Sequence, residues 1–310
     1  MARPLVQDVH IDQALTMLSV EYTNPSFVAE KIMPVVSVKK ESDKYFIYGR
    51  QDLKKYHTIL TPKGETREFE YTIDKALPYS LSERGLHTFV PQRVIENADT
   101  PLDPQKDAVR KLTNAIMLDY EVEVANKLTD ISTYPSGHYE ALSTASKWSD
   151  YTNSNPIKKV DDIKVIIQKD CGRLPNTMLV SRDVFNTLRN HPVIKDVIKY
   201  TQFGIPRNED MARAFEIENF IVAEAVSDTE QEGQTRTTNW VWNNVCIIAY
   251  VEKSPSLYSM SFGYTFRKQN YRKVLTETYK DPEGIKVIVK DMFDPYIISG
   301  YAGYLLTSVV

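Results

Sequence analysis

An uninterrupted stretch from Pro104 to Asp130 constrains the fold of this chain more than any other feature. Asp103 is a suitable N-cap, Pro104 fits the first helical position, and neither glycine nor a further proline follows before residue 131. A helix of that length is roughly 40 Å long, well beyond the average in globular proteins. The sequence therefore predicts one long helix with a broad apolar face.

The apolar residues of this helix fall on two adjoining stripes at helical spacing. We expect the main stripe to contain Ala108, Leu112, Ala115, Leu118, Val122 and Ala125, flanked by Val109, Ile116, Tyr120 and Val124. Charged residues such as Lys111 and Lys127 occupy the remainder. A helix covered on only one side serves as a strut against which a sheet lies.

Composition narrows the class of protein. With 310 residues and 42% hydrophobic content, the chain can build two or three compact lobes. The net charge of −3 gives no global basic field, which argues against a protein that reads nucleic-acid sequence. Cys171 and Cys246 are the only cysteines, so we expect reduced thiols and synthesis in a cytoplasm.

The sequence predicts neither a signal peptide nor a membrane-spanning helix. The first residues, MARPLVQDVHIDQALTML, lack the apolar core of a signal peptide. No stretch approaches the ~20 apolar residues of a spanning helix. We expect a protein that is neither secreted by that route nor integral to a membrane.

Residues 1–43 are expected to form an extended arm with a short helix near 12–20. Val35, Val36 and Val38 favour an extended path after Pro34. The apolar residues of the arm need a surface to lie on, in the same subunit or a neighbour; they include Phe27, Val28, Ile32 and Met33.

Residues 44–81 predict a long hairpin. The strand candidate 45–48 is matched on the returning side by alternating Phe69, Tyr71 and Ile73, with a polar stretch between them. Because apolar residues occur only at its base, the hairpin has no core of its own. It therefore needs a partner surface.

The remaining chain predicts an α/β lobe and a second sheet. Helices at 156–169, 182–190 and 192–200 alternate with apolar strands at 177–181, 219–226 and 240–251. From residue 261 two long strand regions flank a turn at Asp281, Pro282 and Gly284, which predicts an antiparallel hairpin. This hairpin supplies the sheet for the long helix, and the apolar tail is expected to return as a strand into the lobe.

Local motifs for chemistry are absent from the sequence. The five histidines never stand at metal-ligand spacing, and no phosphate loop or nucleophile elbow occurs. Carboxylate pairs such as Glu121 and Glu123 are expected to lie on solvated faces. We predict no catalytic, cofactor or metal site, and expect the basic run 267–273 to be an exposed strand rather than a nucleic-acid groove.

The order of these segments resembles a tailed-bacteriophage major capsid protein of the HK97-like fold. The resemblance rests on the arm NPSFVAEKIMPVVSV leading into KYFIYGRQD, then a long hairpin, a spine helix, an α/β lobe and late long strands. It implies an α+β fold with an N-terminal arm (1–43), an extended loop (44–81), a peripheral domain (82–155 and 256–295) and an axial domain (156–255 and 296–310).

The resemblance also implies a function. The chain would assemble with itself into hexamers and pentamers of an icosahedral shell around double-stranded DNA, in a virion assembled in a bacterial cytoplasm. Portal, separate scaffolding and decoration proteins are implied partners, with no cofactor and no membrane. Arm and hairpin would reach neighbouring subunits, which gives as contact candidates Phe27, Val28, Ile32, Met33, Arg50, Lys54, Lys55, Lys63 and Arg67.

Three further possibilities stay open at this point. Some members of that family crosslink a hairpin lysine to an asparagine, but Lys54, Lys55 and Lys63 are expected to solvate the loop. An encapsulin-like shell would enclose protein cargo instead of a genome. A soluble α/β enzyme would use scattered residues such as Cys171 or Asp161.

Overall fold

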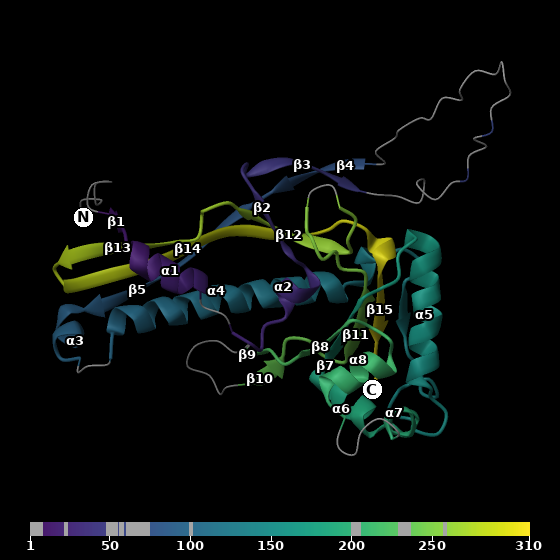
Figure 1. Cartoon of the computed structure of the whole chain (residues 1–310). Helices are drawn as coiled ribbons and strands as arrows, with labels where there is room; N and C mark the ends of the chain where they lie inside the picture. The colour runs from purple at the N-terminus through teal and green to yellow at the C-terminus, as the bar shows by residue number, and fades with distance from the viewer. Residues whose placement is uncertain are drawn as a thin grey trace.

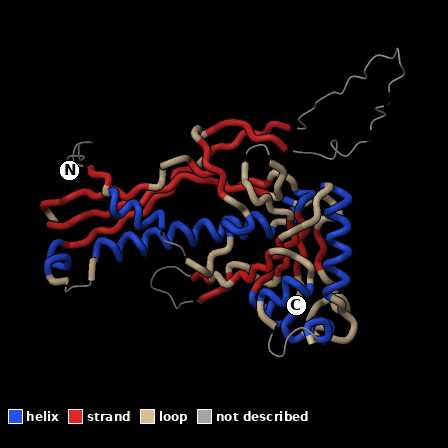
Figure 2. The backbone as a smooth tube through the Cα atoms, in the orientation of Figure 1, coloured by secondary structure: helices blue, strands red, loops and turns tan. Residues whose placement is uncertain are grey.

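The computed structural model describes residues 9–21, 24–47, 55, 59, 75–98, 102–199, 206–228, 237–256 and 259–310. It has two adjoining parts (Figure 1): a long part built on helix α4 (Pro104–Thr129) and a lobe at one end, flanked by helix α5 (Pro156–Cys171). The predicted α+β class is confirmed, with the strands and helices distributed over both parts (Figure 2).

Helix α4 begins and ends as the sequence predicts. The Asp103 side chain accepts hydrogen bonds from the backbone N–H groups of Gln105 and Lys106, which caps the helix. Its buried face, however, is centred on the stripe that we expected to flank it. The fully buried residues are Ala108, Val109, Thr113, Ile116, Met117, Tyr120, Glu121, Val124, Ala125 and Leu128.

The prediction that the main stripe forms the centre of the buried face is therefore wrong. Leu112, Leu118 and Val122 are only half-buried, and Ala115 is exposed. The reason is that α4 is covered from two directions, by strands of the long sheet and by the helices of the arm. The buried arc lies between these two contacts.

A six-stranded sheet lies along α4 in the described part of the chain. The strand order is β1-β13-β14-β12-β2, and β5 pairs with β14. All pairs are antiparallel except β2 with β12. The strands are β1 (Val9–Ile11), β2 (Val35–Val38), β5 (Ser82–Pro91), β12 (Gly263–Lys268), β13 (Lys273–Lys280) and β14 (Glu283–Ile297). The predicted late hairpin is thus confirmed as β13 and β14.

The arm and the hairpin base adjoin this sheet. Helix α1 (Gln13–Glu21) and the short helix α2 (Ala29–Ile32) both contact α4. Strands β3 (Ser42–Ile47) and β4 (Lys75–Ser80) form an antiparallel ribbon, which confirms the hairpin at its base. The predicted returning residues Phe69, Tyr71 and Ile73 lie outside the described residues.

The lobe contains a five-stranded sheet in the order β6-β15-β11-β7-β8. The predicted return of the tail is confirmed, since β15 pairs with β11 and β6. The strands are β6 (Tyr139–Ala141), β7 (Thr177–Ser181), β8 (Asn219–Ala223), β11 (Val245–Ala249) and β15 (Gly303–Thr307); the helices are α5, α6 (Arg182–Asn190), α7 (Pro192–Ile198) and α8 (Asn208–Ala214). Gly172, in the left-handed region at φ 71°, ends α5.

Some elements differ from the prediction. Strand β5, helix α3 (Gln92–Glu96) and α8 were not predicted, and the regions 219–226 and 240–251 are broken by a small ribbon of β9 (Val226–Asp228) and β10 (Thr238–Trp240). Short 3-10 turns occupy Ile131–Thr133 and Gly300–Ala302. Strand β6 pairs in the lobe sheet, so residues 139–141 lie with the lobe rather than with α4.

Candidate functional site

The groups that could perform chemistry are arranged for structure. His191 Nδ1 accepts a hydrogen bond from the Val193 N–H at 3.3 Å, so its Nε2 donates to Ser154 Oγ at 3.0 Å and cannot act as a base toward that hydroxyl. Burial raises the pKa of the Cys171 and Cys246 thiols, which disfavours a reactive thiolate. Among the described residues, no group of three or more His, Cys, Asp or Glu is placed to hold a metal ion.

The sharpest polar site is a buried carboxylate on α4. Glu121 is 0% exposed and joins three parts of the chain. Its Oε2 accepts from the N–H of Val28 at 3.0 Å and of Ala29 at 2.8 Å, where the arm enters α2. Its Oε1 accepts from Trp242 Nε1 at 2.7 Å, which belongs to the lobe segment between β10 and β11.

Burial raises the pKa of Glu121 above its ordinary value, and the three N–H donors oppose that shift. The expectation that Glu121 lies on a solvated face is therefore wrong. A sequence signal existed, because Glu121 falls between Met117 and Val124 on the buried arc of the helix. Its donors lie more than 90 residues away in both directions, so their identity was not readable from the sequence.

The arm is seated along α4 by further polar contacts. Ser19 Oγ and Thr113 Oγ1 are 2.8 Å apart in the core, and Asn24 Nδ2 donates to Asn114 Oδ1 at 3.0 Å. The Thr265 hydroxyl donates to the Met33 carbonyl oxygen at 3.3 Å. These contacts hold the arm at several points along its own subunit.

This seat corrects part of the predicted contact set. Val28, Ile32 and Met33 are 2%, 0% and 0% exposed, so they offer no surface to a neighbouring subunit in this conformation. Their receiver is the core of their own chain. Phe27 is half-buried against that core and keeps some exposed surface.

The hairpin ribbon is attached at its base by aromatic packing. The Tyr79 ring lies 5.0 Å from the Phe266 ring of β12, and the Tyr45 ring lies 5.5 Å from that of Tyr296. Farther out, Leu77 is 40% exposed. Among the predicted contact residues of the hairpin, Lys55 is exposed, whereas Arg50, Lys54, Lys63 and Arg67 lie outside the described residues.

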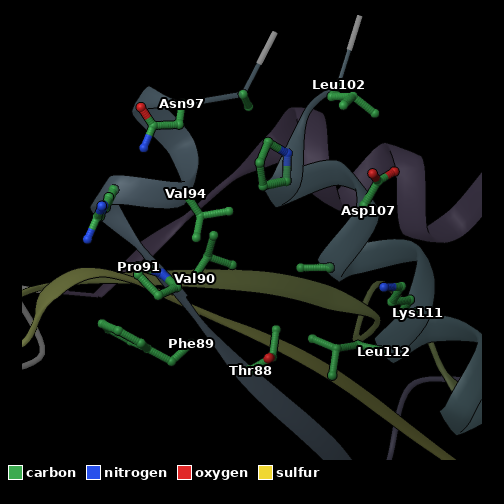
Figure 3. A pocket seen from close by; sticks show the side chains of 14 residues that line it. Thr88, Phe89, Val90, Pro91, Val94, Asn97, Leu102, Asp107, Lys111 and Leu112 are labelled. Carbon is green, nitrogen blue, oxygen red and sulfur yellow. The ribbon is translucent and has the colours of Figure 1, made fainter.

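The far end of the long part carries an exposed apolar groove. It lies between the end of β5, α3 and the first turns of α4, and encloses about 800 Å³. Val90, Val94 and Leu102 line it, with Asp107 and Lys111 at its side (Figure 3). Leu102 is 66% and Val94 49% exposed, which is typical of a surface that another protein covers.

No helix in the described ranges combines the length and the apolar character needed to cross a membrane. The described residues form three notable features: a protruding ribbon, an exposed apolar groove and an arm seat that ties two parts together.

Several known proteins are similar to this chain in sequence. A family model described as phage major capsid protein E matches residues 126–262. The chain is 30% identical over 306 residues to the major capsid protein of Burkholderia phage BcepMu, covering 96% of both chains. It is 28% identical over 261 residues to the major capsid protein of Pseudomonas phage JBD67, covering 82% of both.

Solved structures share the fold at lower identity. A phage-related protein from Bordetella bronchiseptica RB50 superposes with a TM-score of 0.80 at 23% identity, over 96% of this chain and 97% of that one. The capsid of cyanophage P-SCSP1u gives a TM-score of 0.59 at 10% identity, over 93% and 89%. A virus-like particle protein from Pyrococcus furiosus gives 0.53 at 12% identity, over 94% and 96%.

These structures establish the HK97-like capsid fold, which encapsulins also have. The relatives found along nearly the whole sequence are structural components of phage particles, and this excludes the enzyme hypothesis. With 30% identity over 96% of its length, the chain belongs to the family of phage major capsid proteins.

Proposed function

We propose that this capsid protein forms the icosahedral shell, built of hexamers and pentamers, that encloses the double-stranded DNA of a tailed phage. The support is the family membership together with two surfaces that the subunit leaves without a partner, the hairpin ribbon and the groove at the far end of α4. Shells accumulate many modest contacts per subunit, so neither surface has to be large.

The proposal assigns a structural role to each part of the chain. Residues 82–138 and 256–295 act as the peripheral domain, with α4 as its spine, and 139–255 with 296–310 act as the axial domain. Residues 44–81 act as the extended loop over a neighbouring subunit. Its contact residues are Arg50, Lys54, Lys55, Lys63 and Arg67, with Phe27 added from the arm.

The proposed partners follow from the same model. The subunit meets a portal and separate scaffolding and decoration proteins, during assembly in the cytoplasm of a host bacterium. A net charge of −3 suits an inner wall that lies near DNA without binding phosphates tightly, because strong phosphate contacts make binding depend steeply on salt.

The observation that carries the proposal is the ribbon of β3 and β4. Of the ribbon side chains that the structure describes, only Tyr45 and Tyr79 are buried, and two-stranded ribbons are marginal in water without a supporting surface. In Figure 1 the ribbon lies on the outer side of the long part, away from the lobe core. A neighbouring subunit supplies the missing support.

Electron microscopy of the protein expressed alone, and together with its phage's other capsid proteins, tests this proposal. We expect particles tens of nanometres across whose contents absorb as nucleic acid when the phage's packaging proteins are present. Particles that enclose only protein would support the encapsulin-like alternative. A small oligomer under all these conditions would refute the shell.

A second variant tests the carrying observation directly. Replacing residues 48–74 with a short Gly-Ser turn keeps β3 and β4 intact and should abolish particles while the circular dichroism spectrum is retained. A boiled denaturing gel of wild-type particles should show single subunits, since we expect Lys54, Lys55 and Lys63 to form no crosslink. Normal particles from the shortened variant would contradict the role of the hairpin.

A further inference from the structure

Helix α8 carries two grooves of opposite charge character on the surface of the lobe. Its inner side packs into the lobe through Met211, which is 0% exposed. The Asp210 carboxylate caps the helix by accepting from the Arg207 N–H at 3.0 Å. One groove faces α6, and the other runs along the exposed side of α8.

The groove toward α6 is basic. It encloses about 480 Å³ and is lined by three arginines, Arg182, Arg189 and Arg207, around the ring of Phe185. Arg182 forms an ion pair with Glu224 and lies 5.6 Å from the Phe185 ring centre. Arg189 and Arg207 have no ion pair with any residue in the described parts of the chain.

The groove along the exposed side of α8 is acidic. It encloses about 490 Å³, and its charged lining is Glu209, Arg213, Glu216 and Glu218. Glu209 and Arg213 lie one turn apart on α8, and Glu216 follows the end of the helix at a φ of 50°. Glu218 pairs with Lys253 at 2.8 Å, whereas Glu209 and Glu216 have no ion pair among the residues that the structure describes.

The two grooves lie on either side of α8, and Glu209 at the start of the helix lines both of them. The two guanidinium groups that are unpaired among the described residues match two carboxylates that are likewise unpaired there, and a planar guanidinium binds a carboxylate through two parallel hydrogen bonds. Different surfaces that fit each other produce head-to-tail contacts, which close into rings when the rotation allows it.

We propose that the basic groove of one copy receives the acidic face of α8 from the next copy around a capsid ring. The occupant is a second copy of this chain, and the inference rests on the proposed shell function. A nucleic acid is a poor occupant, because its continuous phosphate backbone would run from the basic groove onto the acidic groove directly beside it. Each copy thus uses its two grooves on two different neighbours.

Charge reversal in the basic groove tests this contact, with a control on α8. Arg207→Glu combined with Arg189→Glu should raise the protein concentration needed for particle formation by about tenfold or more, since the loss recurs at every ring contact. Arg213→Glu changes the same residue type on α8 itself but adds to the acidic face, so particle formation should remain within about twofold of wild type.

The helix itself strengthens this control. A glutamate is favoured near a helix N-terminus and disfavoured near a C-terminus. Folding of α8 therefore favours the Arg207 change over the Arg213 change, whereas assembly is expected to show the opposite order. Thermal melts of the unassembled variants verify that all of them fold.

A compensating variant completes the test. Adding Glu216→Arg and Glu218→Arg to the double reversal inverts the net charge of both grooves and leaves Glu209, which lines both, unchanged, so particle formation should recover to within about threefold of wild type. Wild-type particles together with unimpaired assembly of the double reversal would overturn this contact and leave the shell function standing. Absence of wild-type particles would overturn the shell function, and this inference with it.

Discussion

The strands of the two sheets in this subunit differ in how much of their surface is buried. In the lobe, β7 and β11 are buried along their whole length, and their sequences TMLVS and VCIIA are almost purely apolar. In the long part, β5 is exposed along most of its length, and in β13 only Val274 is fully buried. The lobe is therefore organised by continuous apolar runs, and the long part by contacts on one face of its sheet.

The long part contains most of the buried carboxylates in the described chain. Three of the four fully buried carboxylates in the described chain lie there, namely Glu121, Asp291 and Asp294. Arg84 contacts Asp294 at 3.3 Å and Asp119 at 2.7 Å, and Arg272 contacts Asp291 at 2.8 Å. Polar contacts of this kind join segments distant in the sequence, which teaches that the arm, spine and sheet depend on one another for their positions.

The largest expected effect tests the apolar lobe. Ile247 is 0% exposed at the centre of β11, so Ile247→Ala should lower the free energy of unfolding by about 4 kcal/mol through lost burial and a cavity. Urea unfolding of the unassembled subunit measures it. Ile166→Ala on the half-buried side of α5 is the control and should cost about 1 kcal/mol. Equal losses of unfolding free energy in the two variants would show that a buried position of β11 contributes no more to stability than a half-buried position of α5.

The next effect tests the polar junction of the long part. Glu121→Gln places an amide NH₂ where a carboxylate oxygen accepts hydrogen bonds, so a buried N–H of Ala29 or Trp242 loses its acceptor. We expect a loss of about 2–3 kcal/mol in unfolding free energy and faster proteolysis of the arm.

Glu123→Gln is the matched control for that junction. Glu123 lies two residues along α4, and its 25% exposed side chain pairs with Lys127 and Arg84. Its change should cost about 1 kcal/mol, because Arg84 keeps its contacts with Asp119 and Asp294. If Glu121→Gln and Glu123→Gln lose equal stability, the hydrogen bonds of Glu121 to the arm and the lobe contribute no more than a partly exposed ion pair.

A smaller effect tests whether the two parts differ in their local signals. Asp103→Ala removes the cap of α4 and Asn155→Ala that of α5, where the side chain accepts from the Lys158 N–H at 3.1 Å. Each should cost about 1 kcal/mol in thermal or urea unfolding. An Asp103→Ala loss as large as that of Glu121→Gln would show that α4 is held mainly by its own ends.

The smallest effect concerns pH and lies in the lobe. Burial lowers the pKa of His191 below 6.5, so the unfolded chain binds the proton more strongly than the folded one. The contribution of His191 is therefore fully present above pH 6.5 and is lost as pH falls through the lowered pKa. His191→Asn keeps an N-cap for α7 and should flatten this part of the stability profile, by less than about 1 kcal/mol between pH 7.5 and 5.

Ser154→Ala is the control for the pH effect. It removes the hydroxyl that contacts His191 Nε2 but leaves the ring to titrate, so the dependence on pH should persist. A flattened profile in this variant, or an unchanged one in His191→Asn, would assign the dependence to another group.

Sequence patterns predicted elements wherever the signal was local. The bounds of α4 and α5 follow from Asp103, Pro104, Pro156 and Gly172, and β7 coincides with its apolar run. Strand β5 escaped prediction because its sequence SERGLHTFVP is mostly polar and its pairing with β14 supplies the order. A strand that buries only one or two side chains leaves no periodic signal.

The candidate surfaces likewise include one that the sequence predicted and one that it did not. The hairpin base was recognisable from apolar residues confined to it, and the structure pairs its first strand, β3, with β4. The predicted returning residues 69–73 lie outside the described residues. That Val28, Ile32 and Met33 are buried in their own subunit was not recognisable, because an apolar arm fits an own or a foreign surface equally well. Geometry alone distinguishes the two.

By itself, then, the sequence determined the long spine helix, the apolar lobe strands and the order of segments from which the capsid fold is recognised. Only the tertiary structure decided which face of α4 is buried, where the arm lies and that Glu121 joins arm, spine and lobe. The physical reason is range: caps and periodicity act within a few residues, whereas these contacts join groups more than 90 residues apart and depend on how the whole chain packs.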